Sequence, residues 1–282
     1  MRTKAISNLN QAKDTDLFRI VSEGMSNIIE NSSVIFSDAQ KLLGQDCYRG
    51  YNILRMIASE EAAKFMILLD AVRCDRSNSD SFSKQLKRYN DHLSKGIYSE
   101  YYEIKPSDFQ EVQEWVDNER QEFYLDGPND VDWIFPNCTL HQREEKIYVD
   151  YIEIEDKYQW SLPENNELSL MNKSSLKLIP KIIQISTTLY NVGISDSRSL
   201  EVIAHIWRPI KMDKNYHWYE IKELNKETLI NLESENLLKN IDEPTVSYII
   251  DNWLFPIYSL DTRIIKVEQG KLKDIQNDWS PW

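Results

Sequence analysis

Glycine and proline are scarce in this chain. Only seven glycines and nine prolines occur among its 282 residues. All-β and doubly wound α/β proteins need both residue types for their many turns, whereas long helices largely exclude them. The sequence also contains no phosphate-binding loop, no dinucleotide-binding glycine motif and no Gly-x-Ser-x-Gly elbow. The composition therefore favours an all-α fold and argues against the enzyme classes that depend on those motifs.

Cysteines and long apolar runs are also few. The three cysteines, Cys47, Cys74 and Cys138, are odd in number and widely spaced, which favours reduced thiols over a disulfide framework. The first sixteen residues lack the apolar region of a secretory signal, and no apolar run approaches the length of a membrane span. These absences predict a cytoplasmic protein without a membrane partner.

Positive charge is in deficit. Lysine and arginine total 33 against 46 aspartates and glutamates, so the formal net charge is -13. Such a balance argues against a protein that coats nucleic acid or an anionic membrane, although it is compatible with a small local basic site. The apolar content of 41% is sufficient for a substantial core.

Apolar residues recur at helical spacing along most of the chain. The ranges in which this spacing predicts helices are 14–43, 47–73, 81–98, 109–125, 167–190, 197–207, 216–240 and 244–260. Residues 31–33 are a weak point where the first helix is expected to bend or break. Apolar and polar residues alternate over 146–154, which predicts a short strand or extended segment. Pro163 begins the best boundary, so two regions are expected, 1–162 and 163–282.

A glutamate interrupts the apolar stripe of the second predicted helix. Glu61 falls in the middle of the stripe formed by Leu54, Ala58, Phe65, Leu68, Leu69 and Val72. A carboxylate that faces a core is costly unless it is paired or protonated. Glu61 is therefore expected to receive a cation or hydrogen-bond donor from a neighbouring helix. Glu60 and Lys64, four residues apart, are expected to form an exposed ion pair.

The next predicted helix carries Arg88, His92 and Lys95, which are the candidate partners. Antiparallel helices joined by a short loop pack side by side, which can bring Glu61 or Glu60 close to His92 or Lys95. A histidine oriented by a carboxylate, together with cations that hold a phosphate, can cleave a phosphodiester without a metal. The alternative is structural: Glu61 locks two helices together, and Arg88 and His92 belong to a polar helix face.

Four weak motifs occur in order along the first half of the chain. They consist of Asn31, Asp38-Ala39 and Leu42; Tyr51, Ala58 and Glu60-Glu61-Ala62-Ala63-Lys64; His92-Leu93-Ser94-Lys95; and Ile147-Tyr148-Val149-Asp150. In this order and spacing they resemble the AbiV branch of the HEPN superfamily, a group of bacterial abortive-infection proteins. The resemblance covers about residues 17–152. Ala63 stands where that family usually has glycine, and Ile147 where it has leucine.

The resemblance implies an antiparallel helical bundle that forms a homodimer and acts in antiphage defence, without a cofactor or metal. Ribonucleases of the superfamily typically have four to six residues between an arginine and a histidine, whereas Arg88 and His92 have three between them. In a toxin-like ribonuclease, His92 would be the general acid–base and Arg88 and Lys95 would hold the phosphate of RNA. Glu61 would orient His92 or Lys95.

The second implied function is a catalytically silent dimer that binds a phage or host protein and blocks translation. The cluster around Glu61 would then be a structural lock. In either case Glu60, Lys64 and Asp150 are the expected supporting residues. Residues 163–282 carry no resemblance and are expected to form a helical extension of unknown role.

Two further signals have structural alternatives. Cys138 and His141 have the spacing of half a zinc site, but no second pair completes it, so no metal is expected. Residues 207–209 and 217–219 are rich in aromatic side chains, which would either stack on bases, bind a protein partner or pack against the bundle.

Overall fold

The protein is built mainly of helices. The computed structural model describes residues 5–124, 135–154, 157–163, 178–213 and 215–268, and the single positions 270, 271, 274 and 277. Its helices are η1 (Ile6–Gln11), α1 (Asp14–Gly44), α2 (Tyr48–Arg73), α3 (Ser79–Arg88), α4 (His92–Tyr101), α5 (Phe109–Glu119), α6 (Cys138–Glu145), α8 (Lys181–Asn191), α9 (Ser197–Trp207), α10 (Trp218–Ser234) and α11 (Glu243–Asn252). Among the described residues, no helix is both long and apolar enough to cross a membrane.

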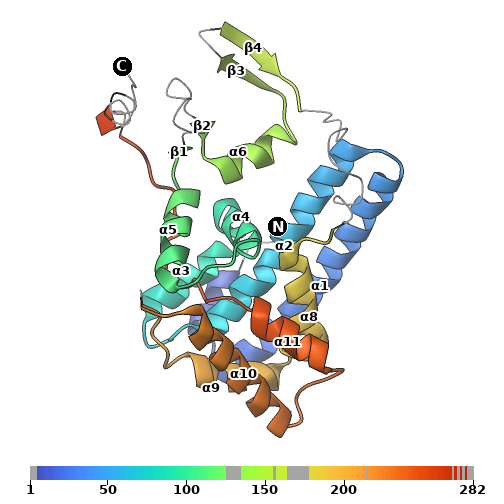
Figure 1. Cartoon of the computed structure of the whole chain (residues 1–282), viewed down its shortest axis with the longest axis vertical. Helices are drawn as coiled ribbons and strands as arrows, with labels where there is room; N and C mark the ends of the chain where they lie inside the picture. Colours follow the sequence, from blue (N-terminus) through green and yellow to red (C-terminus); the bar gives the residue numbers. More distant parts are fainter. Residues whose placement is uncertain are drawn as a thin grey trace.

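Two small antiparallel sheets complete the described secondary structure. Strand β1 (Phe123–Tyr124) pairs with β2 (Phe135–Pro136), and β3 (Asp150–Ile154) pairs with β4 (Lys157–Ser161). The β3–β4 hairpin projects from the bundle at the end opposite α9 and α10 (Figure 1). The predicted mostly helical fold, with a short β element near residues 146–154, is confirmed.

The helices α1 and α2 form a long antiparallel pair, and the expected interruption of α1 at residues 31–33 does not occur. Ser32 is buried and its hydroxyl donates a 2.9 Å hydrogen bond to the carbonyl oxygen of Ala58 on α2. A serine hydroxyl can weaken a helix by bonding to backbone groups of that helix, but here the hydroxyl bonds to the neighbouring helix instead. The polar residue therefore joins the two helices where a bend was predicted.

The prediction of one helix over residues 81–98 is wrong, because α3 and α4 are separate helices. Asp91 caps the start of α4: its carboxylate accepts hydrogen bonds of 2.7 Å from both the backbone nitrogen and the hydroxyl of Ser94. Such a cap satisfies amide groups that a helix start leaves unpaired, so the chain can turn and begin a new helix. His92 is consequently the first residue of α4 and Arg88 the last residue of α3.

Other predicted helices exist but have shorter bounds. Helix α10 ends at Ser234, shortly before Asn236, which adopts a left-handed backbone conformation with φ of 56°. Helix α11 ends at Asn252, shortly before Phe255, whose position ahead of Pro256 disfavours helix. Helix α5 likewise ends at Glu119. Of the helix predicted over 167–190, the structure contains α8, and residues 164–177 lie outside the described part of the chain.

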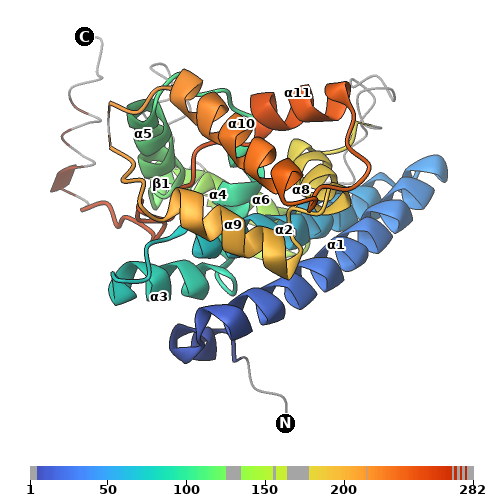
Figure 2. The same ribbon diagram turned by 90° about the horizontal axis from the view of Figure 1, so that it is seen from below.

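The centre of the molecule is α2, which packs against α1, α3, α4, α8 and α9. Figures 1 and 2 show α8 to α11 gathered together alongside the α1–α2 pair. One buried cluster contains apolar residues from both sides of Pro163, among them Phe65 and Ile97 from the first part and Ile183 and Trp207 from the second. The two regions predicted from the sequence therefore share one hydrophobic core.

The segment after α11, which we call the C-terminal strap (residues 253–265), runs back to the first half of the chain. The hydroxyl of Tyr101 donates to the carbonyl oxygen of Phe255 at 3.2 Å. The backbone nitrogen of Ile257 donates to the Asp70 carboxylate at 2.9 Å. The carbonyl oxygen of Ile265 accepts from the backbone nitrogen of Glu122 at 2.8 Å. The strap thus ties α2, α4 and the end of α5 together.

The aromatic residues near 207 and 217 divide between the core and the surface. Trp207 is fully buried, and Trp218 packs against Phe255 with ring centroids 5.8 Å apart. Tyr219 is exposed and stacks on His217. Packing against the bundle, the structural alternative, accounts for the two tryptophans.

Candidate functional site

Glu60 is the centre of a group of charged side chains that come from three helices. One of its oxygens lies 3.0 Å from Nδ1 of His92 and 3.1 Å from Nζ of Lys95. The other lies 3.1 Å from Nε of Arg143. We call these four residues the Glu60 cluster. It joins one carboxylate of α2 to two basic residues of α4 and one of α6.

The local structure of α4 and α6 explains how these side chains meet. His92 and Lys95 are three residues apart on α4, so they share one helix face, and their side-chain nitrogens are 3.2 Å apart. Helix α6 begins after Asn137, whose side chain accepts from the backbone nitrogen of Leu140 at 3.1 Å. The Asn137 amide also donates to the carbonyl oxygens of Glu119 and Gln121. This buried asparagine therefore fixes the helix of Arg143 against the end of α5.

The Glu60 cluster combines buried charges with a half-exposed imidazole. The side chains of Lys95 and Glu60 are 7% and 12% exposed, whereas that of His92 is 48% exposed. Nδ1 of His92 is engaged by the cluster, and Nε2 has no hydrogen-bond partner in the described part of the chain. One ring nitrogen is therefore fixed and the other is open for proton transfer, an arrangement typical of catalytic histidines.

The cations keep Glu60 ionised. Burial of the carboxyl group raises its pKa, but the nearby charge and hydrogen bond of Lys95, followed by those of His92, outweigh burial and leave the pKa below its ordinary value. An ionised Glu60 provides a fixed negative charge against which the basic side chains are ordered.

Glu60 and His92 line a cleft of about 330 Å³. Its other lining residues are Asn52, Arg55, Met56, Ser59, Gly96, Ser99, Glu100, Glu103, Ile104, Trp115, Glu119, Cys138, Thr139, Gln142, Arg143 and Lys146. Burial raises the pKa of Glu100 and of Glu119, and it lowers the pKa of Lys146. Perturbed ionisable groups gathered in a cleft are typical of functional sites.

Glu61, the residue that the sequence singled out, lies beside the Glu60 cluster. Its carboxylate pairs with Lys64 of the same helix at 2.5 Å. The expected Glu60–Lys64 pair is therefore replaced by Glu61–Lys64, and the expected contact with His92 and Lys95 belongs to Glu60. Neighbouring residues differ by about 100° around a helix, so the two glutamates face different neighbours.

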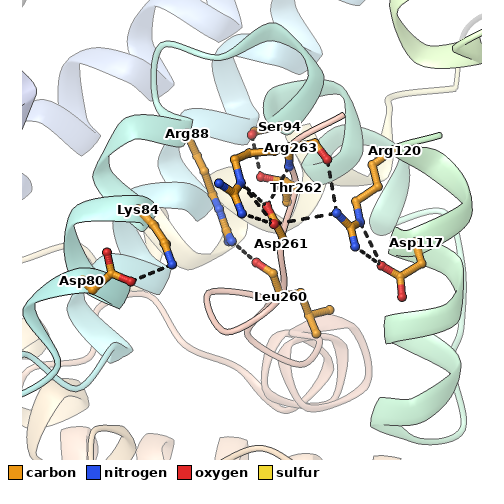
Figure 3. Close-up of polar contacts among 10 residues, drawn as sticks. All are labelled: Asp80, Lys84, Arg88, Ser94, Asp117, Arg120, Leu260, Asp261, Thr262 and Arg263. Carbon is orange, nitrogen blue, oxygen red and sulfur yellow. Dashed lines mark hydrogen bonds and ion pairs between the residues drawn. The ribbon is translucent and has the colours of Figure 1, made fainter. Parts of the chain in front are cut away.

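Arg88 is also separate from the Glu60 cluster. Its side chain is buried, and Nη1 donates to Oε1 of Gln85 at 2.7 Å and to the carbonyl oxygen of Ile257 at 2.9 Å. Nη2 donates to the carbonyl oxygen of Leu260, as Figure 3 shows. Arg88 thus binds the C-terminal strap, while the arginine beside His92 and Lys95 is Arg143.

Two residues differ from what the motifs predicted: Asp150 lies outside the site, and Arg143 belongs to the site but was not predicted. Asp150 begins β3, is exposed, and belongs to the projecting hairpin in Figure 1, outside the Glu60 cluster. Arg143 is 83 residues from Glu60 in the sequence, and its helix was not predicted. The available signal was Asn137, a favourable N-cap residue directly before the short segment that carries Arg143.

Metal ligation is not a feature of the described residues. No three or more His, Cys, Asp and Glu side chains among them are grouped to hold an ion. His141, from the candidate zinc pair, lies 2.7 Å from Glu145 instead. The Glu60 cluster itself groups an imidazole, an ammonium and a guanidinium around one carboxylate.

Comparison with known proteins identifies the family. The family model for AbiV, a HEPN group, matches residues 20–169, which is more than half of the chain. No curated protein and no solved structure matches the sequence. The matched region contains all four residues of the Glu60 cluster. We conclude that the chain belongs to the AbiV family and is an abortive-infection protein of the HEPN type.

Proposed function

We propose that this protein is an abortive-infection effector that stops the growth of the infected cell by cleaving RNA, without a metal ion, at the Glu60 cluster. The observation that carries the proposal is the state of His92. Its Nδ1 lies 3.0 Å from Glu60, which also binds Lys95 and Arg143, and its Nε2 has no hydrogen-bond partner among the described residues. Membership of the AbiV family supports the role in defence.

The imidazole would provide the proton transfers. Nε2 of His92 would take the proton of a ribose 2′-hydroxyl, whose oxygen attacks the neighbouring phosphorus, and a protonated imidazole would return a proton to the leaving 5′-oxygen. A positioned histidine typically contributes 10²- to 10⁴-fold to such a step. Glu60 would fix the ring orientation, as the third group of a catalytic triad does.

Arg143 and Lys95 would stabilise the phosphate. Only Nε of Arg143 is used on Glu60, and its two terminal amino groups have no partner in the described part of the chain. A guanidinium group with free terminal donors can bind two phosphate oxygens at once. Lys95 adds a second charge next to the imidazole. Arg143 would therefore take the phosphate-binding role that the ribonuclease hypothesis gave to Arg88.

A homodimer would bring two such clusters together, as the resemblance to HEPN proteins implies. One cluster has a single histidine, whereas cleavage requires both a base and an acid. A second copy would supply the second imidazole at the same cleft. The oligomeric state of the purified full chain, measured by light scattering, tests this part of the proposal.

The decisive experiment compares His92→Ala with His141→Ala. Both remove a histidine that is paired with a glutamate, but His141 lies outside the cluster on α6. We expect His92→Ala to reduce cleavage of total RNA at least about 100-fold, with unchanged circular dichroism, and His141→Ala to cleave as wild type does. The proposal fails if wild-type protein protects cells from phage while RNA remains intact in cells and with purified protein.

The second candidate function is a silent effector that binds a phage or host protein. The observation in its favour is the β3–β4 hairpin, in which Tyr151, Tyr158 and Trp160 are exposed. The ring of Tyr151 lies 5.0 Å from that of Trp160 and 6.1 Å from that of Tyr158, so the three form one aromatic surface. Exposed aromatic clusters are typical of protein-binding surfaces.

Phage protection separates the two functions. If the silent effector is correct, Trp160→Ser abolishes protection while His92→Ala retains it. If the ribonuclease is correct, His92→Ala abolishes protection. Thermal unfolding provides the control for Trp160→Ser, because an exposed side chain on a projecting hairpin contributes little to the stability of the bundle.

A further inference from the structure

His92 borders two cavities. Besides the cleft of the Glu60 cluster, it lines a second cavity of about 640 Å³ between the α3–α4 corner and the C-terminal strap. The lining residues on which the argument depends are Lys84, Lys87, Leu140, Tyr258, Arg263 and Ile264. The strap contributes residues 258–264 to this cavity, and all of them lie outside the four sequence motifs and beyond the family match at residues 20–169.

The charge of the second cavity is opposite to that of the chain. Its lining contains four lysines and arginines and only two aspartates, whereas the whole chain has a net charge of -13. Lys84 is paired with Asp80 at 2.6 Å, and Arg263 with Asp261 at 2.6 Å. Lys87 is exposed and forms no ion pair with any residue that the structure describes. A local cationic site in an acidic protein concentrates anionic ligands.

The wall formed by the strap is held in place by polar contacts with α3, α4 and the end of α5 (Figure 3). The buried hydroxyls of Ser94 and Thr262 are 2.8 Å apart, and the buried Arg88 donates to the carbonyl oxygen of Leu260. Arg120 lies 2.7 Å from Asp117 and 3.8 Å from Asp261, so α5 also holds the strap. The cavity is therefore preformed, which lowers the entropy cost of binding a ligand.

We propose that this second cavity binds one nucleotide unit, with its phosphate at Lys87 and its base against the apolar side chains of Leu140, Tyr258 and Ile264. The volume lies within the range of small-ligand sites. Cations next to an aromatic and aliphatic surface suit a nucleotide, because the phosphate needs charge and any base can pack on its flat face. An acidic peptide would use the cations and leave the apolar surface uncovered.

This proposal extends the proposed function, because His92 is shared between the two cavities. A strand of RNA whose nucleotide occupies the second cavity would pass His92 as it enters the cleft lined by Glu60. The same chemistry is also present in a free nucleotide, which would occupy the cavity as a separate ligand and change access to His92. An RNA strand and a free nucleotide can be distinguished by testing which of them competes for the cavity.

Binding to the full-length protein tests the proposal directly. The probe is a fluorescein-labelled octamer of 2′-O-methyl uridylate, which lacks the free 2′-hydroxyl and so is not cleaved. We expect Lys87→Glu to weaken binding about tenfold and to reduce the slope of log affinity against log salt by about 1. Lys226→Glu is the matched control, because the same charge change lies on α10, which lines neither cavity. It should leave binding unchanged.

Competition identifies the source of the nucleotide. If uridine monophosphate displaces the octamer and inorganic phosphate does not, the cavity takes a free nucleotide. If only unlabelled octamer displaces it, the cavity takes a residue of a strand. The proposal is overturned if wild type does not bind the octamer, if Lys87→Glu and Lys226→Glu weaken binding equally, or if hexaglutamate competes as well as the octamer. Should wild type bind through Lys87 and never cut RNA, the ribonuclease function fails while the nucleotide site stands.

Discussion

Glu60 and Glu61 are adjacent and similarly buried, yet their surroundings differ. Glu60 has basic partners on two other helices, whereas Glu61 has Lys64 of its own helix. Removing the charge of Glu60 leaves Lys95 and Arg143 close together without their shared counter-charge. Unpaired charges in a partly buried network are strongly destabilising, whereas a single pair along one helix contributes little.

The pair of variants Glu60→Gln and Glu61→Gln measures this difference. We expect Glu60→Gln to lower the free energy of unfolding by about 2 kcal/mol and Glu61→Gln to lower it by less than about 0.5 kcal/mol. Urea denaturation of both variants at neutral pH provides the measurement. Equal losses would show that the contacts of Glu60 with α4 and α6 do not contribute to stability.

The lowered pKa of Glu60 predicts how this difference depends on pH. An acid whose pKa is lower in the folded than in the unfolded protein stabilises the fold above its unfolded pKa. That stabilisation is lost as the pH falls through the folded value, which lies below the ordinary 4.5. The stability gap between wild type and Glu60→Gln should therefore be constant near neutrality and shrink below about pH 4.5. A gap that widens on acidification would contradict the assignment.

The sequence located this polar cluster but assigned its members only in part. His92 and Lys95 were identified, since their three-residue spacing places them on one face of a helix. The choice of Glu61 over Glu60 depended on a helical wheel, and the wheel cannot show where the neighbouring helix starts. Arg143 was missed because it approaches from α6, 83 residues along the chain. Local patterns predict which residues share a helix face, but not which distant face they meet.

At the scale of elements, long periodic helices were predictable and their breaks were not. The helices α1, α2 and α9 lie close to their predicted ranges because apolar residues recur at helical spacing along the whole length of each. The stripe of Phe82, Leu86, Leu93 and Ile97 also continues at helical spacing, and all four residues are buried. It nevertheless spans two helices, because the cap made by Asp91 turns the chain without changing which residues are buried. Burial and helix continuity are separate properties.

Gly96 sets the distance between α4 and α6. A Cβ atom at this position would lie 2.1 Å from Cγ2 of Thr139, far closer than carbon atoms approach without a shift. Rotating the Thr139 side chain away would break the hydrogen bond that its hydroxyl donates to the Glu119 carboxylate at 3.2 Å. The absence of a side chain at Gly96 therefore allows α6 to approach α4, and that approach places Arg143 beside Glu60.

Gly96→Ala should therefore reduce activity although alanine favours helix. Without the clash, the substitution would stabilise α4 by about 1 kcal/mol. With it, we expect a lower melting temperature and about a tenfold loss of RNA cleavage, because displacement of a catalytic group by about 1 Å costs activity. Thr139→Ser removes Cγ2 and keeps the hydroxyl. The double variant Gly96→Ala/Thr139→Ser should therefore recover both the melting temperature and the RNA cleavage of wild type. If Gly96→Ala alone is more stable and fully active, the close approach of α6 is not needed.

At the scale of the whole molecule, buried polar groups join the family-matched part to the C-terminal part. The Asp70 carboxylate accepts from the hydroxyl of Tyr98 at 2.7 Å and from the backbone nitrogen of Ile257 at 2.9 Å, and it pairs with Arg73. Arg73 is completely buried, and its guanidinium carbon lies 4.7 Å from the ring of Trp207 and 5.2 Å from that of Trp253. The residues beyond Pro163 thus cover a charge that lies within α2.

This arrangement predicts that residues 1–163 do not fold without the rest of the chain. Truncation would expose the apolar face of α2 and remove both tryptophan rings from Arg73 and the strap carbonyls from Arg88. Breaking a buried ionic network costs about 3–5 kcal/mol, and the lost apolar burial adds to it, against a typical total stability of about 5–15 kcal/mol. We expect the full chain to unfold in one cooperative transition in urea and the truncated chain to show none.

A chain ending at residue 268 retains the strap and is the matched control, which should unfold as the full chain does. A cooperative transition in residues 1–163 would instead make the family-matched part an independent domain, as the boundary predicted at Pro163 implies, and would leave the strap as an addition to a site that is complete without it.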